Sequence, residues 1–185
     1  MVSKWEIFGL TFLAYTSIHA LRTSYSESKS SIQKDLSLDS KLMGILDSLM
    51  LTFLGIGHFI HAVKPMKKPV RNLWIALILC ALNFISLPML IDADIFHHYT
   101  YLLIFMILNG FMQSYTWPTL LTVVNSKFCS KQNSTLLGFW STNANFGNII
   151  GYFVFQVIRF DWKLNLIIIG IYTLANGLLI CLRVS

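Results

Sequence analysis

The chain has 185 residues, of which 55% are hydrophobic and 12% are charged, and its net charge at pH 7 is +6. Soluble domains carry about 25% charged residues, so this composition excludes an ordinary soluble domain and indicates a membrane protein. The bases lie in short segments between apolar runs, which fits membrane topology better than nucleic-acid binding.

A membrane-spanning helix needs about 20 mostly apolar residues. Runs of this kind recur along the chain, and we expect helices over about 5–30, 41–63, 70–91, 99–124, 135–159 and 164–182. The segments between them are short, which favours an antiparallel bundle. The sequence therefore predicts an all-α membrane protein, with residues 1–185 forming a single six-helix transmembrane domain.

Lysine and arginine in the connecting segments indicate the orientation, because these residues are enriched on the cytoplasmic side. With the N-terminus inside, the inner bases are Lys4, Lys64, Lys67, Lys68, Arg71, Lys127, Lys131 and Arg183, and the outer bases are Lys34, Lys41, Arg159 and Lys163. The inner set is about twice the outer set. We therefore expect both termini in the cytoplasm.

Polar side chains recur along the first expected helix at three- and four-residue steps. They are Thr11, Tyr15, His19, Arg22, Ser26 and Lys29. At about 100° per residue these side chains share one face, and a charge in hydrocarbon is costly enough that such a face should line a wet interior. Arg22 and Lys29 have no acid on this face. An uncompensated cationic stripe suits an anion, and the arginine fork fits phosphate oxygens.

Arg22 also has a simpler interpretation. If the first helix ends early, Arg22 lies about 25 Å along the axis from Trp5, at ~1.5 Å per residue. Its side chain could then reach the outer interface as an ordinary helix-end anchor. The periodicity alone leaves both interpretations open.

The second expected helix carries Asp47, His58 and His61 loosely on one face. Intramembrane acids and imidazoles can relay protons, but we favour a buried histidine bonded to a backbone carbonyl.

The fourth expected helix has Asn109, Gln113 and Trp117 at four-residue steps, followed by Pro118. A proline kink beside polar residues can shape a pocket, while amides also link helices to one another.

The fifth expected helix has Asn143, Gly147 and Gly151 at the same spacing. Glycines at that step let two helices approach closely, so we expect packing there. For Asn143 the pocket and packing interpretations both stand.

Catalytic signatures are not visible: the sequence has no nucleophile elbow, P-loop, paired carboxylates or metal-ligand spacing,. We therefore expect no enzyme activity, no catalytic residue, no metal site and no cofactor.

Several segments resemble a known family. NGFMQSYTWPTLLTVVNSKF and LLGFWSTNANFGNIIG resemble helices four and five of the organophosphate:phosphate antiporters of the major facilitator superfamily, especially their eukaryotic glucose-6-phosphate and glycerol-3-phosphate exchangers. YTSIHALRTSYSESKSSI is similar to that family's first helix, and GILDSLMLTFLGIGHFIHA to its second. The resemblance covers essentially the whole chain and corresponds to the N-terminal six-helix half of such a transporter.

The resemblance implies roles for particular residues. In that family the helix-one arginine binds the substrate phosphate, and Arg22 matches it. Lys29 matches a lysine common in the eukaryotic branch, His58 falls where bacterial relatives have a substrate-facing lysine, and Asn143 falls where some relatives have a histidine. The candidate substrate-binding residues are Arg22, Lys29, His19, Tyr15, His58, Trp117 and Asn143.

Three departures from the family pattern stand out. Thr23 replaces a lysine that usually follows the arginine. The segment GHFIHAVKPMKKPVRNLW keeps its bases but lacks, around Ala62, the aspartate that helps to gate the inner side. Third, and most important, these 185 residues lack the second half of the family's fold, which carries its other phosphate-binding arginine.

The resemblance implies exchange of a phosphorylated sugar or glycerol phosphate for inorganic phosphate by alternating access. The partners expected are the organophosphate, inorganic phosphate, the lipid bilayer and a second six-helix half from the same gene, a second copy or a separate chain. Nucleic acid is not expected. The family suggests the endoplasmic reticulum membrane. The alternative, favoured by the departures, is a degenerate half-transporter that serves as a non-transporting structural subunit of a membrane complex.

Overall fold

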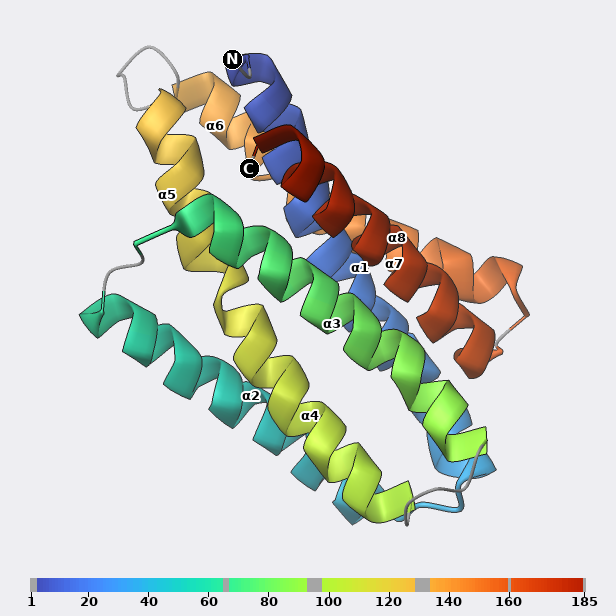
Figure 1. The fold of residues 1–185 in the computed structure, drawn as a ribbon. Helices are drawn as coiled ribbons and strands as arrows, with labels where there is room; N and C mark the ends of the chain where they lie inside the picture. Colours follow the sequence, from blue (N-terminus) through green and yellow to red (C-terminus); the bar gives the residue numbers. More distant parts are fainter. Residues whose placement is uncertain (1–2, 65–66, 93–97, 129–133, 160, 185) are drawn as a thin grey trace.

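The computed structural model describes residues 3–64, 67–92, 98–128, 134–159 and 161–184, which form helices joined by turns. The helices are α1 (Lys4–Asp35), α2 (Ser40–Val63), α3 (Pro69–Asp92), α4 (His98–Ser114), α5 (Thr116–Phe128), α6 (Ser134–Trp140), α7 (Asn143–Val157) and α8 (Trp162–Val184). They form one bundle, and the two chain ends lie at the same end of it (Figure 1). Lys131, one of the inner bases, lies outside the described residues.

Three of the described helices, α2, α3 and α8, are long and apolar enough to cross a membrane by length and composition. α1 is longer than any of these, but its polar stripe makes it less apolar. The all-helical fold is therefore confirmed for the described residues, whereas the count of six spans and the cytoplasmic termini stay predictions.

The first helix extends beyond the expected range of 5–30. α1 begins after Ser3, whose hydroxyl accepts a hydrogen bond from the Glu6 backbone N–H at 3.1 Å, and it continues to Asp35. Arg22 is consequently in the body of a 32-residue helix. Its side chain is far from either helix end.

The expected helix over 99–124 is two helices in the structure. α4 ends at Ser114 and α5 begins at Thr116. Pro118 lies in the first turn of α5, where its missing N–H breaks no helical hydrogen bond, and its ring would clash with the carbonyl four residues earlier, which belongs to Ser114. The proline therefore explains the break between α4 and α5.

The expected helix over 135–159 is also divided. α6 ends at Trp140 and α7 begins at Asn143 after a short turn. The Thr142 backbone N–H donates to the Phe139 carbonyl at 3.0 Å in this turn.

Helix packing follows a pattern with internal symmetry. α1 packs mainly on α7 and α8, α2 on α4, and α3 on α8, α4 and α5. This set of pairs is unchanged if α1 is exchanged with α4–α5, α2 with α6–α7 and α3 with α8. Two equivalent three-helix repeats produce such a pattern, and repeats of this kind are common in transporter folds.

Glycines allow the closest of these contacts, as the sequence predicted. A methyl group at Gly151 would lie 2.6 Å from the Ala20 carbonyl oxygen, and one at Gly147 would overlap the Thr16 carbonyl oxygen. These two glycines bring the backbones of α1 and α7 together. Gly110 similarly brings α4 against the backbone of α2.

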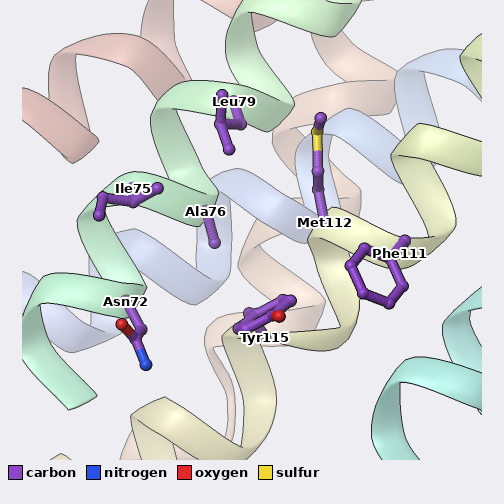
Figure 2. A pocket seen from close by; sticks show the side chains of 7 residues that line it. All are labelled: Asn72, Ile75, Ala76, Leu79, Phe111, Met112 and Tyr115. Carbon is purple, nitrogen blue, oxygen red and sulfur yellow. The ribbon is translucent and has the colours of Figure 1, made fainter. Parts of the chain in front are cut away.

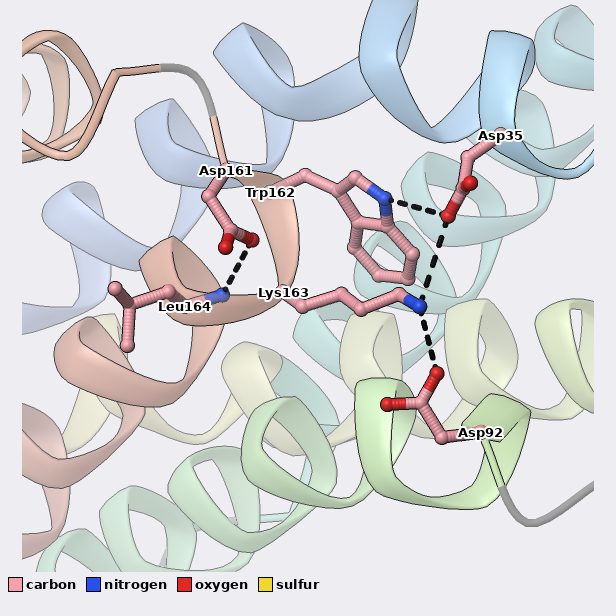
Figure 3. Close-up of polar contacts among 6 residues, drawn as sticks. All are labelled: Asp35, Asp92, Asp161, Trp162, Lys163 and Leu164. Atoms are coloured by element: carbon pink, nitrogen blue, oxygen red, sulfur yellow. Dashed lines mark hydrogen bonds and ion pairs between the residues drawn. The ribbon is translucent and has the colours of Figure 1, made fainter.

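Charged side chains join the ends of α1, α3 and α8 (Figure 3). Lys163 Nζ lies 2.6 Å from Asp92 Oδ1 and 3.7 Å from Asp35 Oδ2. The Trp162 indole N–H also donates to Asp35 Oδ2, at 3.1 Å. Asp161 caps the first turn of α8 by accepting a backbone N–H at 3.0 Å. One lysine therefore holds the carboxylates of two other helices.

Candidate substrate-binding site

Arg22 turns into the bundle and meets two buried amides of α4. Its Nε–H donates to Oε1 of Gln113, and Nε2 of Gln113 donates to Oδ1 of Asn109 at 2.7 Å. Both amide side chains belong to fully buried residues. The inward contact fits the interpretation of Arg22 as a cavity residue and does not fit an anchor at the interface.

The Arg22 guanidinium has no carboxylate within ion-pair distance among the described residues. Gln113 supplies only a neutral acceptor, which orients the group and leaves its positive charge in place. The bond to Gln113 uses Nε, so the two terminal NH2 groups remain for a ligand. A cation fixed in this way, away from bulk water, favours an anion with paired oxygens, such as phosphate.

Lys29 is not free, and the expectation of an uncompensated stripe is wrong at this residue. Its Nζ lies 2.7 Å from Oδ2 of Asp47 on α2. The acid is absent from the same face of α1, as the sequence indicated, but the neighbouring helix supplies it. The two side chains are 33% and 38% exposed.

A cavity of about 210 Å³ brings the two cations together. It is lined by Arg22, Tyr25, Ser26, Lys29, Asp47, Met50, Leu51, Phe84 and Asn109. These residues come from α1, α2, α3 and α4. Its charged side chains are two cations and one acid, so the cavity carries a net positive charge.

Tyr15, His19 and Trp117 form an aromatic group next to this cavity along α1. The Tyr15 ring centroid lies 4.6 Å from that of His19 and 4.9 Å from that of Trp117, and Trp140 of α6 lies 6.4 Å away. Tyr15 is seven residues from Arg22, or about 10 Å along the helix. Tyr15 therefore lies about two turns from Arg22, whereas His19 lies less than one turn from it, between the aromatic and the cationic candidates,.

His58 and Asn143 do not line the cavity with Arg22. His58 Nε2 is buried and has no hydrogen-bond partner among the described residues, so the expected carbonyl bond is not made by this nitrogen. Asn143 is buried at the start of α7, and neither polar atom of its side chain has a hydrogen-bond partner in the part of the chain that the structure describes. Its backbone carbonyl accepts from the Thr16 hydroxyl at 3.2 Å, which ties α7 to α1.

A protein-family model described as the Major Facilitator Superfamily matches residues 7–185. The chain belongs to the major facilitator superfamily. Membership in this superfamily of transporters makes the chain an integral membrane protein and favours transport over catalysis as its class of function.

Superfamily members named as phosphate-ester exchangers are among its relatives. The chain is 26% identical over 200 residues to the human glucose-6-phosphate exchanger SLC37A2, with 94% of this chain and 40% of the relative covered. It is 25% identical over 203 residues to mouse sugar phosphate exchanger 3, with 94% of this chain and 41% of the relative covered. It is 27% identical over 168 residues to the putative glycerol-3-phosphate transporter 2 of Arabidopsis thaliana, with 84% of this chain and 33% of the relative covered.

The chain spans about 40% of the length of the first two of these relatives. It therefore corresponds to an N-terminal half of such a superfamily transporter, as the resemblance indicated.

Sequence reasoning missed the partners of the two cations. The four-residue spacing of Asn109 and Gln113 was visible, but it did not show that these amides face Arg22, which is 91 positions from Gln113 in the chain. Asp47 was noted only beside the histidines of its own helix. Side-chain periodicity identifies which face of a helix is polar, whereas the partner depends on how the helices pack.

Proposed function

We propose that this chain is half of an alternating-access transporter that carries a phosphorylated sugar or glycerol phosphate across a membrane in exchange for inorganic phosphate. The observation that carries the proposal is the setting of Arg22: a guanidinium oriented by a neutral buried amide, with no carboxylate partner among the described residues. The names of the relatives support the substrate class.

In this proposal Arg22 binds the phosphate group common to both substrates. Lys29 is a second cation that an anion reaches by competing with Asp47. Tyr15, His19 and Trp117 contact the organic part of the substrate, since aromatic faces suit the apolar faces of a sugar or glycerol. His58 and Asn143 contribute polar groups when the two halves close.

Alternating access requires a second half to cover the polar face of α1. We propose six spans in this chain, both termini in the cytoplasm and residence in the endoplasmic reticulum membrane. The second half comes from the same gene, a second copy or a separate chain.

Exchange measured in reconstituted vesicles tests the proposal. The natural protein, with any partner that copurifies, is placed in vesicles loaded with phosphate, and uptake of labelled phosphate is followed. We expect Arg22→Ala to lower exchange at least tenfold, because a hydrogen bond to a charged group contributes roughly 1.5–3 kcal/mol. Arg22→Lys keeps the charge but loses the fork, and should retain part of the exchange.

Arg183→Ala is the matched control. Arg183 is exposed at the end of α8, and its one described ion pair, with Glu6, is long at 3.9 Å. Exchange that is equal in the wild type and in Arg22→Ala, or absent from both, would contradict the proposal. A stable complex with unrelated membrane proteins would then identify the chain as a non-transporting structural subunit.

A further inference from the structure

A groove lies between the first half of α3 and the end of α4, away from the cavity that contains Arg22. It has a volume of about 380 Å³ and is lined by Asn72, Ile75, Ala76, Leu79, Phe111, Met112 and Tyr115. None of these residues lines the Arg22 cavity. The groove is therefore a separate feature of the bundle.

The groove is polar at one end and apolar at the other (Figure 2). Asn72 and Tyr115 lie at one end, while Leu79 and Met112 lie toward the other. Asn72 and Leu79 are seven residues apart, so the groove follows α3 for about 10 Å. The volume is more than ten times the roughly 30 Å³ that one water occupies in the liquid. Its shape and polarity suit a flexible apolar chain that enters from a polar boundary.

Exposed bases stand at the polar end. Lys68 immediately precedes α3, and Arg71 lies one helical turn before Ile75. Both also line a second hollow, of about 430 Å³, together with Trp74 and with Val184 of α8. The segment from Lys64 to Arg71 holds four bases, which makes it the densest basic segment of the chain. Bases and tryptophan at this position are typical of the cytoplasmic membrane interface, where anionic lipids are enriched.

We propose that this groove binds the acyl chain of an anionic phospholipid whose head group lies against Lys68 and Arg71. Charge complementarity selects the head group, and the apolar walls formed by Ile75, Leu79 and Phe111 hold the chain. A phosphate ester that lacks an acyl chain would leave the apolar end of the groove unfilled, so the occupant is a lipid and not the transported substrate. The inference does not depend on the proposed transport.

Competition between two lipids tests the head-group contact. The purified natural protein is mixed with equal amounts of phosphatidylserine and phosphatidylcholine of identical acyl chains, and bound lipids are counted by native mass spectrometry. We expect preferential binding of phosphatidylserine, and a loss of that preference by about tenfold or more in Lys68→Gln/Arg71→Gln, since the variant loses two bases that each attract an anionic head group. Lys34→Gln/Lys41→Gln removes two exposed bases elsewhere and should keep the preference. Equal binding of both lipids by the wild type overturns the proposal.

Photolabelling tests the position of the acyl chain. Phosphatidylserine with a diazirine within its chain is bound to the same protein, and labelled peptides are mapped. Labels should fall on the α3 and α4 residues that line the groove and disappear in Leu79→Trp, which fills it. Leu178→Trp on α8 is the control, because Leu178 is 48% exposed and Leu79 is 41% exposed. Labels spread evenly over all exposed helices would show an unselective lipid shell and overturn the proposal.

Discussion

Lys29 on α1 and Asp47 on α2 form an ion pair with Nζ and Oδ2 2.7 Å apart, at the wall of the cavity that also contains Arg22. The pair leaves Arg22 as the one cation in that wall without a carboxylate partner among the described residues. An anion bound between Arg22 and Lys29 would have to compete with Asp47. Asp47 therefore competes with the proposed anionic substrate for Lys29.

We predict that Asp47→Asn strengthens phosphate binding. The change removes a negative charge from the cavity wall and frees Lys29, and at this partly exposed position the gain should be about 1 kcal/mol, or roughly fivefold in affinity. Bound phosphate stabilises the folded protein by an amount that rises with the logarithm of phosphate concentration over Kd, so titration of the unfolding temperature with phosphate measures the effect.

Lys29→Gln in the Asp47→Asn background is the control for this prediction, because it removes the freed cation and should cancel the gain. The unfolding free energy without phosphate should change by less than about 1 kcal/mol in Asp47→Asn, since partly exposed ion pairs contribute little. Weaker phosphate binding in Asp47→Asn would refute the competition model.

We predict that Gln113→Glu strongly weakens phosphate binding while the protein remains folded. A carboxylate at this position would pair with the Arg22 guanidinium that the amide now orients. The new ion pair neutralises the charge that attracts phosphate, so affinity should fall at least about tenfold. The unfolding temperature without ligand should stay the same or rise.

Gln113→Leu separates charge from orientation. It removes the acceptor for Arg22 and should lower the unfolding free energy by roughly 1.5–3 kcal/mol, because a charged donor loses its partner. Phosphate binding should weaken less than in Gln113→Glu, since the positive charge remains. Equal losses of phosphate binding in the two variants would show that orientation alone matters.

We predict that Gly147→Ala and Gly151→Ala each lower the unfolding free energy by about 1–3 kcal/mol, the usual range for overpacking. Their added methyl groups would meet the carbonyl oxygens of Thr16 and Ala20 and push α7 away from α1. Gly138→Ala is the matched control, because a methyl group there meets open space, and alanine is the better helix former,. Thermal unfolding of the purified variants in one detergent gives the comparison, and equal stability of all three would contradict it.

We predict that Lys163→Met lowers the unfolding free energy by up to about 1 kcal/mol at low salt, because Asp35 and Asp92 then lose their common cation,. The effect should shrink at about 1 M salt, where exposed charges are screened. Lys41→Met removes an exposed lysine without a described ion pair and serves as the control. A loss that is independent of salt would show that the side chain acts by packing and not by charge.

The polar face of α1 could be predicted from the sequence, because a helix of L-residues has a fixed period and repeated three- and four-residue steps place side chains on one face. That Gly147 and Gly151 form a close helix contact could be predicted from their four-residue spacing, but not that the neighbour is α1,. Gln113 and Asp47 could not be paired with Arg22 and Lys29, because those contacts depend on which helices become neighbours.

The ends of the helices were harder to predict from the sequence. α1 continues to Asp35 because the serine-rich stretch after Arg22 still packs on α8: Asn165 donates to the Ser24 carbonyl at 3.1 Å and to the Ser28 hydroxyl at 3.0 Å. Local composition suggested an end, and tertiary contacts extended the helix. At Pro118 the proline was visible, but the break between α4 and α5 that it causes lies at Tyr115, three residues earlier.

The glycine contacts have a mechanical consequence. Gly147 and Gly151 fasten α7 to α1, while Gly110 fastens α4 to α2. Each of these joints connects one helix of the first three-helix repeat to one of the second, so the repeats cannot slide past one another without opening a backbone contact. The bundle should consequently move as a rigid block. Under the proposed alternating access, Arg22 would keep the same neighbours whether the site opens to one side of the membrane or to the other.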